Sequence, residues 1–392
     1  MRPEDFIDGA PGELVEVQVS ERPITAGQSG WAFVPDLLPP SLDLGPLLGP
    51  LGVSLVDAAK ALGRLDGMDS QSPVLRPIWL REVRSSSAIE NTVATAEEVA
   101  LAAAGQSFEY GAPREVLNNL RALELGLGSS QPLTLGLMRH MHRVLLDDVR
   151  GADLHPGELR GGQAYIGDPR RGFSAARFVP PPASELARLV DNLIEFINSP
   201  PPDMPQLVAI GIAHYQFETI HPFRDGNGRL GRLLISRSLC REGLLSRPLV
   251  TVSASIDANR PRYYDLLRRV STHADWHAWL SFFAEAVRHE AIDVARRSEL
   301  LRALRVDFAV RLERDRLTPG MDRLLMALFE RPATTAALIR ESLGVSDLTA
   351  RRYLDRFEAA GILHEVTGGA YAKRYVAPEI IDLIEVDLPA EA

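Results

Sequence analysis

The residues with the clearest chemistry lie in one short segment, His221-Pro-Phe-Arg-Asp-Gly-Asn-Gly-Arg-Leu-Gly-Arg232. Gly226, Asn227 and Gly228 precede an apolar helical stretch, so the backbone N–H groups of the first helical turn face outward and attract phosphate oxygens. The glycines permit the close approach and unusual dihedral angles that an anion site requires, and Asn227 tolerates a left-handed conformation or donates its amide. The segment therefore predicts a helix N-terminus that binds phosphate.

Charged residues flank this turn. Arg229 and Arg232 are three positions apart, near one face of the helix, and planar guanidinium groups suit phosphate. Asp225 is a hard oxygen ligand that can hold Mg²⁺ against the same phosphates, because this ion usually takes one or two carboxylates plus substrate oxygens. His221 titrates near neutrality and could remove a proton from a hydroxyl that attacks phosphorus. Base, metal ligand and phosphate site are thus contiguous.

Two weaker interpretations compete with this one. The stretch Gly226-Asn-Gly-Arg-Leu-Gly231 also satisfies the dinucleotide-binding pattern G-x-G-x-x-G, but that pattern needs a preceding strand, whereas 207–219 is predicted to be helical. His221 taken alone could simply end a helix. Next to Asp225 and two arginines, the catalytic interpretation is favoured.

Bulk composition sets the class of protein. The 392 residues are 45% hydrophobic and carry a formal net charge of −9, which predicts two or three domains and argues against a surface built as a whole for nucleic acid or anionic membrane. The single cysteine, Cys240, excludes a disulfide framework within the chain. There is no signal-peptide pattern and no apolar stretch of membrane-spanning length, so we expect a cytoplasmic protein without membrane contact.

Helical spacing of apolar residues dominates the chain and predicts a mainly α fold. Residues 1–50, rich in Pro and Gly, are expected to form an extended arm. Two alternating stretches, 161–170 and 173–179, surround a Pro-Arg-Arg-Gly turn and predict a β-hairpin. After short helical patterns between 51 and 104, the main predicted helices are 115–127, 134–147, 184–198, 206–218, 227–242, 261–270 and 277–314.

A Thr-Pro-Gly joint at 318–320 begins a smaller unit. Its order of elements is that of a winged helix-turn-helix, with helices Met321–Glu330, Thr334–Leu343 and Asp347–Ala360 followed by strands Ile362–Val366 and Tyr371–Val376. The unit has basic residues on its recognition helix and wing, but 321–376 contains eight Lys/Arg and seven Asp/Glu; the basic residues are Arg351, Arg352, Arg356, Lys373 and Arg374. DNA binding and docking of protein therefore both remain open.

The segment 221–232 resembles the signature of the Fic (filamentation induced by cAMP) family. The resemblance continues through Leu154-His-Pro-Gly-Glu-Leu-Arg-Gly-Gly-Gln163, Phe178-Val-Pro-Pro-Pro182 and Tyr263-Tyr-Asp-Leu-Leu267, and 30–105 is similar to the family's N-terminal extension. It implies a Fic-type helical bundle with a β-hairpin flap, here joined to a C-terminal winged helix. The implied organisation is an arm (1–50), a helical extension (51–112), a catalytic core (113–290), a linking helix (291–318), the winged helix (319–380) and a tail (381–392).

The resemblance also implies an activity, transfer of AMP from ATP to a hydroxyl of a protein. In that family pattern His221 is the general base, Asp225 is the Mg²⁺ ligand, and Arg232 reaches the γ-phosphate. The other phosphate and ATP-binding positions are Gly226, Asn227, Gly228, Arg229 and Gly231. The hairpin resembles the family's flap, which binds the target backbone by strand addition near Tyr165 and Ile166, and the stretch with Asn259 and Tyr264 would form the adenine side.

A regulatory motif of the family is matched as well. Ser86-Ser-Ala-Ile-Glu90-Asn91 fits the inhibitory pattern of Ser or Thr, three residues, Glu, then Gly or Asn. A carboxylate at Glu90 that pairs with Arg232 would occupy the guanidinium group meant for the γ-phosphate and place ATP in a geometry unsuited to in-line attack. The resemblance therefore implies that the enzyme is autoinhibited through Ser86 and Glu90.

The expected function is a protein adenylyltransferase that uses ATP and Mg²⁺ and modifies a Ser, Thr or Tyr hydroxyl of a target protein or of itself. Other Fic-like proteins transfer UMP, phosphate or phosphocholine, and the sequence does not decide among these groups. An alternative is a DNA-binding regulator whose Fic-like domain only senses nucleotide. A homodimer is compatible with either hypothesis.

Overall fold

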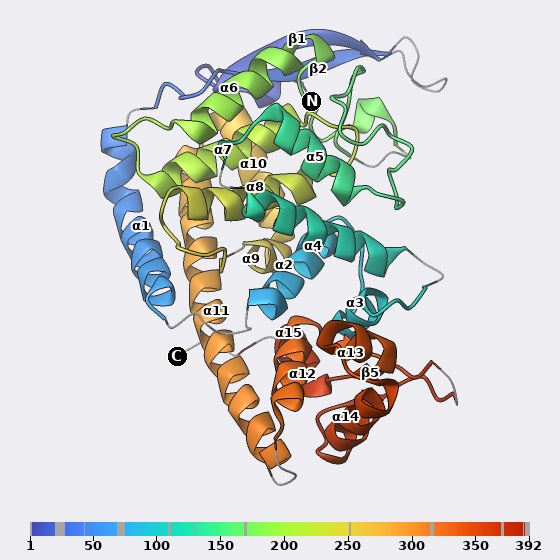
Figure 1. Cartoon of the computed structure of the whole chain (residues 1–392). Helices are drawn as coiled ribbons and strands as arrows, with labels where there is room; N and C mark the ends of the chain where they lie inside the picture. Colours follow the sequence, from blue (N-terminus) through green and yellow to red (C-terminus); the bar gives the residue numbers. More distant parts are fainter. Residues whose placement is uncertain are drawn as a thin grey trace.

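The computed structural model describes residues 2–19, 28–42, 44–68, 75–108, 111–129, 131–167, 171–250, 252–313, 317–369, 372–386 and 388. The described chain is mainly helical, as predicted, with a helical bundle above and a smaller C-terminal unit below (Figure 1). None of its helices is both long and apolar enough to span a membrane.

The helices of the bundle agree with the sequence pattern to within a few residues at most ends. They are α1 (Leu44–Asp66), α2 (Leu75–Ile89), α3 (Ala96–Ala103), α4 (Ala112–Gly128), α5 (Leu135–Leu145), α6 (Leu186–Asn198), α7 (Gln206–Ile220), α8 (Asn227–Arg241), α9 (Ser253–Ala258), α10 (Arg260–His273) and α11 (Trp276–Glu313). Short 3-10 turns occupy Pro3–Asp5, Phe173–Ala175 and Ala183–Glu185.

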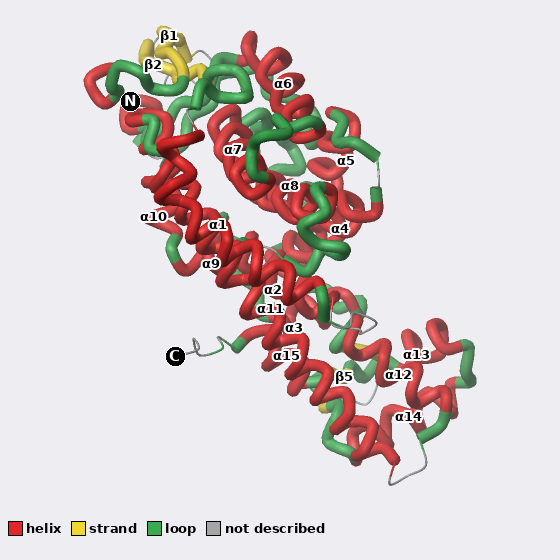
Figure 2. Tube along the Cα trace, turned by 90° about the vertical axis from the view of Figure 1, so that its left-hand side faces the viewer, coloured by secondary structure: helices red, strands yellow, loops and turns green. Residues whose placement is uncertain are grey.

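Helix α7 is the centre of the bundle. Thirteen of its fifteen residues are buried, as expected for a helix that is apolar on all sides, and it packs against α6, α8 and α11. Helix α11 extends for 38 residues and lies beside α1 over much of its length (Figures 1 and 2). Helix α11 runs without a break through residue 290, where the sequence places the boundary between a catalytic core and a linking helix.

The N-terminal segment is not an extended arm. It forms a two-stranded antiparallel hairpin of β1 (Gly12–Val19) and β2 (Gln28–Pro35), with Leu14 opposite Phe33. The alternation of Val15 and Val17 with polar residues is a strand pattern, but the surrounding Pro and Gly outweighed it in the sequence interpretation. The hairpin packs against the predicted flap, where the Phe33 N–H donates to the Val179 carbonyl at 3.0 Å.

The flap is less regular than predicted. Instead of two strands over 161–170 and 173–179, the described residues show a single antiparallel bridge between Ile166 and Phe178 and the 3-10 turn near Phe173. Residues 168–170, at the expected turn, lie outside the described residues. Packing of Phe173, Ala176 and Val179 against the β1–β2 hairpin holds this segment, so its position depends on side-chain contacts more than on a strand ladder.

The C-terminal unit contains the predicted helices and paired strands. They are α12 (Pro319–Glu330), α13 (Ala336–Leu343), α14 (Asp347–Ala359), β4 (His364–Glu365) and β5 (Tyr375–Val376), and the short strand β3 (Ala333–Thr334) completes a sheet of order β3-β5-β4.

The expected tail at 381–392 is wrong at its start, because Pro378–Glu385 form a further helix, α15. Its buried face carries Ile380, Ile381 and Ile384, at helical spacing. Helix α15 packs against α2, α3 and α11. Its Glu385 accepts a hydrogen bond from the Ala96 N–H at 2.5 Å and pairs with Arg84 of α2 at 3.3 Å.

Candidate active site

The loop between α7 and α8 is held in an unusual backbone conformation. His221 ends α7 with φ +48°, and Gly226 precedes α8 with φ +76°, both left-handed. Asn227 closes the loop, because its side chain accepts from the Phe223 N–H and donates to the Phe223 carbonyl, each at 2.9 Å. The Asn227 amide is therefore used inside the loop, and only its backbone N–H is available to a phosphate, which corrects the expectation that its side chain binds one.

The His221 imidazole is kept neutral. Burial lowers its pKa to about 4, and the nearby charge of Arg160 acts in the same direction, while Glu90 and Asp225 act weakly against it. The buried Nδ1 atom has no hydrogen-bond partner among the described residues. A neutral imidazole at physiological pH is the form that can accept a proton.

This low pKa predicts the acid limb of the pH profile. A base of pKa about 4 is deprotonated above that pH, so activity is lost only as the pH falls through about 4. We expect kcat/KM at pH 5.5 to remain close to its value at pH 7.5, whereas an imidazole of ordinary pKa would retain about one tenth. The measurement is the initial rate of the reaction that the sequence predicts, between pH 4.5 and 8, and a limb with a midpoint between 6 and 7 would contradict the assignment.

Asp225 has the surroundings of a cation ligand. Its Oδ1 accepts from the Gly226 N–H at 2.6 Å, and its side chain is about a third exposed, at 31%. Gly151, with φ +89°, passes so close that a Cβ there would lie 2.9 Å from Oδ2, which keeps the space beside this oxygen open. No cluster of three metal-binding side chains occurs among the described residues, so a Mg²⁺ ion held by Asp225 would need phosphate oxygens of the substrate as further ligands.

The first turn of α8 is covered by Glu90. Its Oε1 lies so near Gly228 that a Cβ at that position would be 2.2 Å away, and it pairs with the Arg232 Nη2 at 2.9 Å. Arg232 also donates to the Ser86 hydroxyl at 3.0 Å and to the Ser86 carbonyl at 2.8 Å. A carboxylate thus occupies the position at the helix N-terminus where the sequence predicts phosphate.

The charges of this pair stabilise each other. Burial acts to raise the pKa of Glu90, but the charge and hydrogen bond of Arg232 outweigh it, so the pKa lies below its usual value. For Arg232, burial lowers the pKa, and the charge of Glu90 reverses this to give a raised pKa. Both groups are therefore ionised at neutral pH, and the contact is an ion pair.

Two arginines that the sequence interpretation missed hold the turn that carries Glu90. Arg260 donates to the Ala88 carbonyl at 2.8 Å and to the Asn91 side chain at 3.3 Å. Arg150 donates to the Glu90 carbonyl at 3.4 Å and to the Thr92 hydroxyl at 3.2 Å. No local motif marks either residue, because both contacts join segments far apart in sequence.

Two predicted phosphate ligands have other positions. Arg229 is fully buried and pairs with Glu115 of α4 at 3.1 Å, so it supports the loop from behind. Gly231 faces α7, where a Cβ would lie 2.4 Å from the Glu218 Oε1 and 2.9 Å from the Phe217 ring. Gly231 therefore permits the close approach of α7 and α8, and we assign neither residue to phosphate.

His142 is a further residue that supports the loop. Its ring stacks on Phe223 with 4.0 Å between centroids. The Nδ1 atom accepts from the Gly157 N–H and the Nε2 atom donates to the Asp225 carbonyl, both at 2.8 Å. Burial lowers the pKa of His142, in agreement with this neutral tautomer. His142 thus fixes the backbone at Asp225.

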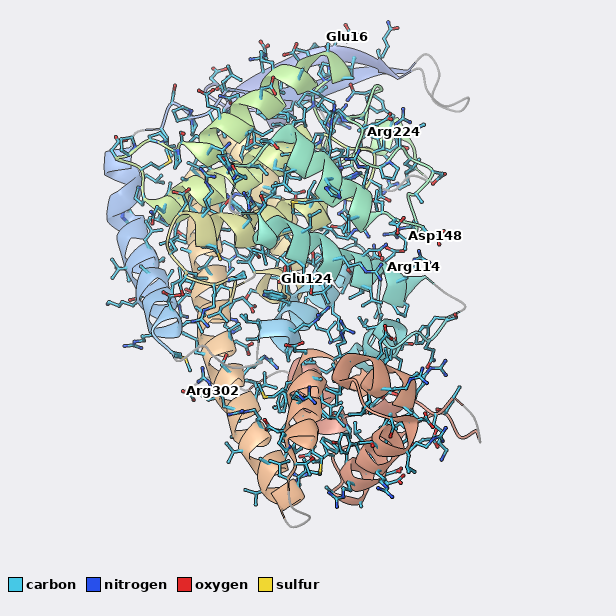
Figure 3. All side chains as sticks on the ribbon, in the orientation of Figure 1. Glu16, Arg114, Glu124, Asp148, Arg224 and Arg302 are labelled. Carbon is cyan, nitrogen blue, oxygen red and sulfur yellow. The ribbon has the colours of Figure 1, made fainter. Side chains whose placement is uncertain are left out.

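The residues predicted to contact adenine lie at the start of α10 and just before it, and those predicted to contact the target lie in the flap. Tyr264 is 40% exposed, and Asn259 joins α9 to α10 with its side chain bonded to the Ser255 carbonyl at 3.0 Å. Ile166 forms the bridge to Phe178, whereas Tyr165 packs edge-on to Phe173. Arg224, to which the sequence interpretation gave no role, is exposed at the surface (Figure 3).

Parts of the sequence are similar to known proteins. The sequence model of the Fic/DOC family matches residues 132–239, and that of the Fic/DOC family N-terminal region matches residues 53–128. The protein adenylyltransferase Fic of Aedes aegypti is 32% identical over 154 residues, which are 39% of this chain and 27% of that protein. The corresponding protein of Drosophila sechellia is 26% identical over 246 residues, which are 57% of this chain and 46% of that protein.

Solved structures agree with the fold. A Fic family protein from Desulfovibrio desulfuricans has a TM-score of 0.55 at 23% identity and covers 84% of this chain and 95% of its own. Fic-1 from C. elegans has a TM-score of 0.54 at 18% identity and covers 65% of this chain and 75% of its own.

The fold and the loop between α7 and α8 define a Fic-type helical bundle. The chain contains a Fic/DOC domain and a Fic/DOC N-terminal region. It matches less than half the length of either curated relative described above.

Proposed function

We propose that this protein transfers AMP from ATP to a Ser, Thr or Tyr hydroxyl of a target protein or of itself, and that Glu90 holds it inactive at rest. The hydroxyl oxygen attacks the α-phosphorus, the bond from that phosphorus to the oxygen bridging to the β-phosphate breaks, and pyrophosphate leaves. His221 takes the hydroxyl proton. The naming of the curated relatives as protein adenylyltransferases supports the reaction class.

The observation that carries this proposal is the pairing of Glu90 with Arg232 over Gly228. The carboxylate uses both features that would bind the terminal phosphates of ATP, the guanidinium group and the first turn of α8. The first turn of α8 and Arg232 thus form an anion site, and the Glu90 carboxylate blocks it. Displacement of Glu90 is then the step that admits ATP in a productive position.

Mg²⁺ would be held by Asp225 and would neutralise charge on the phosphate oxygens when bound. Because Asn keeps an oxygen that can accept from the Gly226 N–H, Asp225→Asn preserves the loop and removes only the charge. In a Glu90→Gly background we expect the Mg²⁺ concentration for half-maximal rate to rise at least tenfold. Measuring rate against Mg²⁺ checks this, and an unchanged half-maximal concentration would exclude Asp225 as the ligand.

Mass spectrometry of the Glu90→Gly protein with ATP and Mg²⁺ tests the whole proposal. We expect an added mass of one AMP on the protein itself or on a protein of a cell lysate, located on a hydroxyl side chain. An adduct of UMP, phosphate or phosphocholine mass in the matching incubations would replace AMP transfer by one of those reactions.

The charges of the C-terminal unit do not favour the alternative of a DNA-binding regulator. On the exposed face of α14, Arg351 is paired with Asp347 at 2.8 Å, and Asp355 and Glu358 offset Arg352. A helix that enters a groove of DNA normally presents net positive charge to the phosphates. We therefore propose the enzyme alone.

A further inference from the structure

Arg160 is a buried arginine at the base of the flap, only 3% exposed, to which the activity described above gives no role. Its guanidinium group donates to four backbone carbonyls in three separate segments of the chain. The acceptors are His221 at 2.8 Å, Ile220 at 3.2 Å, Gly162 at 3.0 Å and Pro181 at 2.6 Å.

These acceptors belong to the two parts of the site that must meet. Gly162 and Pro181 lie at the two ends of the flap, before Ile166 and after Phe178. Ile220 and His221 lie where α7 ends in the left-handed turn. The backbone of Arg160 adds a further contact, because its N–H donates to the Pro222 carbonyl at 2.9 Å. Arg160 therefore connects both ends of the flap to the backbone around His221.

The hydrogen bonds of Arg160 stabilise the left-handed backbone conformation at His221. A histidine rarely adopts φ +48°, and such a conformation persists only when the surrounding structure fixes it. Arg160 holds three successive carbonyl groups, those of Ile220, His221 and Pro222, and thereby fixes the peptide planes on both sides of the base. The direction of the imidazole ring follows from these planes.

We propose that Arg160 is a positioning residue that fixes His221 relative to the flap, so that a hydroxyl docked on the flap meets the base. This inference rests on the proposed function. The fork of the guanidinium group is essential to it, since a lysine offers one nitrogen and cannot reach acceptors in three segments. The target binds the flap and ATP binds α8, so loss of Arg160 should reduce the rate of the chemical step and leave ATP affinity intact.

Arg237 provides a matched control. It is also buried, at 6% exposed, and donates to the carbonyls of Gly126 at 2.6 Å, Ser129 at 2.7 Å and Gln131, all near the end of α4. Removing either arginine deprives buried carbonyl groups of their donor, so both changes should lower stability. Only the change at Arg160 should alter the site.

The experiment compares Arg160→Gln, Arg160→Lys and Arg237→Gln, each in the full chain with Glu90→Gly. The readouts are kcat for AMP incorporation into the protein itself, the Kd of ATP, and hydrogen exchange of the backbone amides at 160–181. For both Arg160 variants we expect a fall in kcat of about 100-fold, an ATP Kd within twofold, and about tenfold faster exchange of the flap amides. Arg237→Gln should leave all three unchanged in the folded protein.

Three results would overturn the proposal: full kcat in Arg160→Gln, restoration of kcat by Arg160→Lys, or an equal fall in Arg237→Gln. Restoration by lysine would mean that only the charge matters. If the Glu90→Gly protein itself transfers no AMP, the proposed function fails. The exchange measurement still decides whether Arg160 fastens the flap, because faster exchange specific to Arg160→Gln supports the contact and unchanged exchange overturns it.

Discussion

Replacing Glu90 by glycine is expected to increase AMP transfer by about 10- to 100-fold. The change removes the carboxylate that pairs with Arg232 at 2.9 Å and covers Gly228, so both become available to ATP. A hydrogen bond to a charged group contributes about 1.5–3 kcal/mol, and 1.4 kcal/mol corresponds to a factor of ten. Incorporation of labelled AMP into the protein itself, or into a cell lysate, measures the increase.

A general loosening of α2 must be separated from loss of the carboxylate. Glu124 of α4, labelled in Figure 3, pairs with Arg76 near the start of α2 at 3.1 Å. Glu124→Gly removes an ion pair of the same helix and should leave the rate at its resting value. If Glu90→Gly shows no increase, or Glu124→Gly shows the same one, the inhibitory role of Glu90 is wrong.

Replacing His221 by alanine in the Glu90→Gly background should reduce AMP transfer at least 100-fold, to undetectable labelling in most assays. A positioned general base contributes about 10²- to 10⁴-fold, and burial keeps this imidazole neutral and able to accept a proton. The phosphate site does not use the His221 side chain in the structure, so the Kd of ATP should change little. The measurement is single-turnover transfer together with ATP binding.

The control for this prediction is a histidine outside the site. His277, on the first turn of α11, is exposed, and His277→Ala should leave both readouts unchanged. Activity that survives His221→Ala would remove the base assignment, and loss of ATP binding would move His221 from proton transfer to nucleotide binding.

The sequence predicted the helical elements well, because they depend on neighbouring residues. The periodicity of apolar residues located the helices around the loop, and the predicted base, metal ligand and phosphate site remain a prediction that lies within one continuous segment, from His221 to Arg232. The pairing of Glu90 with Arg232 was also predicted, although 142 positions separate them. That prediction came from a family pattern, since spacing alone does not bring these residues together.

Contacts between distant segments could not be predicted from local pattern. Arg229 was expected to bind phosphate because it lies three residues before Arg232, but its side chain turns toward Glu115, 114 positions away. His142 and Arg160 bind carbonyls of the loop 83 and 61 positions away, and residue spacing does not indicate either contact. The hairpin β1–β2 was missed for another reason, since Pro and Gly near its ends resemble a segment without strands.

Helix α2 lies between the proposed inhibitory contact at Glu90 and the C-terminal unit, because α15 packs against it. The C-terminal end of α2 leads to Glu90, and Arg84, six residues before Glu90, pairs with Glu385 of α15 at 3.3 Å. If α2 moves as one body when Glu90 leaves Arg232, the contact of Arg84 with Glu385 must break as well, and the free energies of both contacts oppose the movement. A ligand that strengthens the contact of α15 with α2 would then lower the affinity for ATP by some factor, and ATP would lower the affinity for that ligand by the same factor. Under the proposed inhibition by Glu90, the C-terminal unit would be coupled to the nucleotide in both directions.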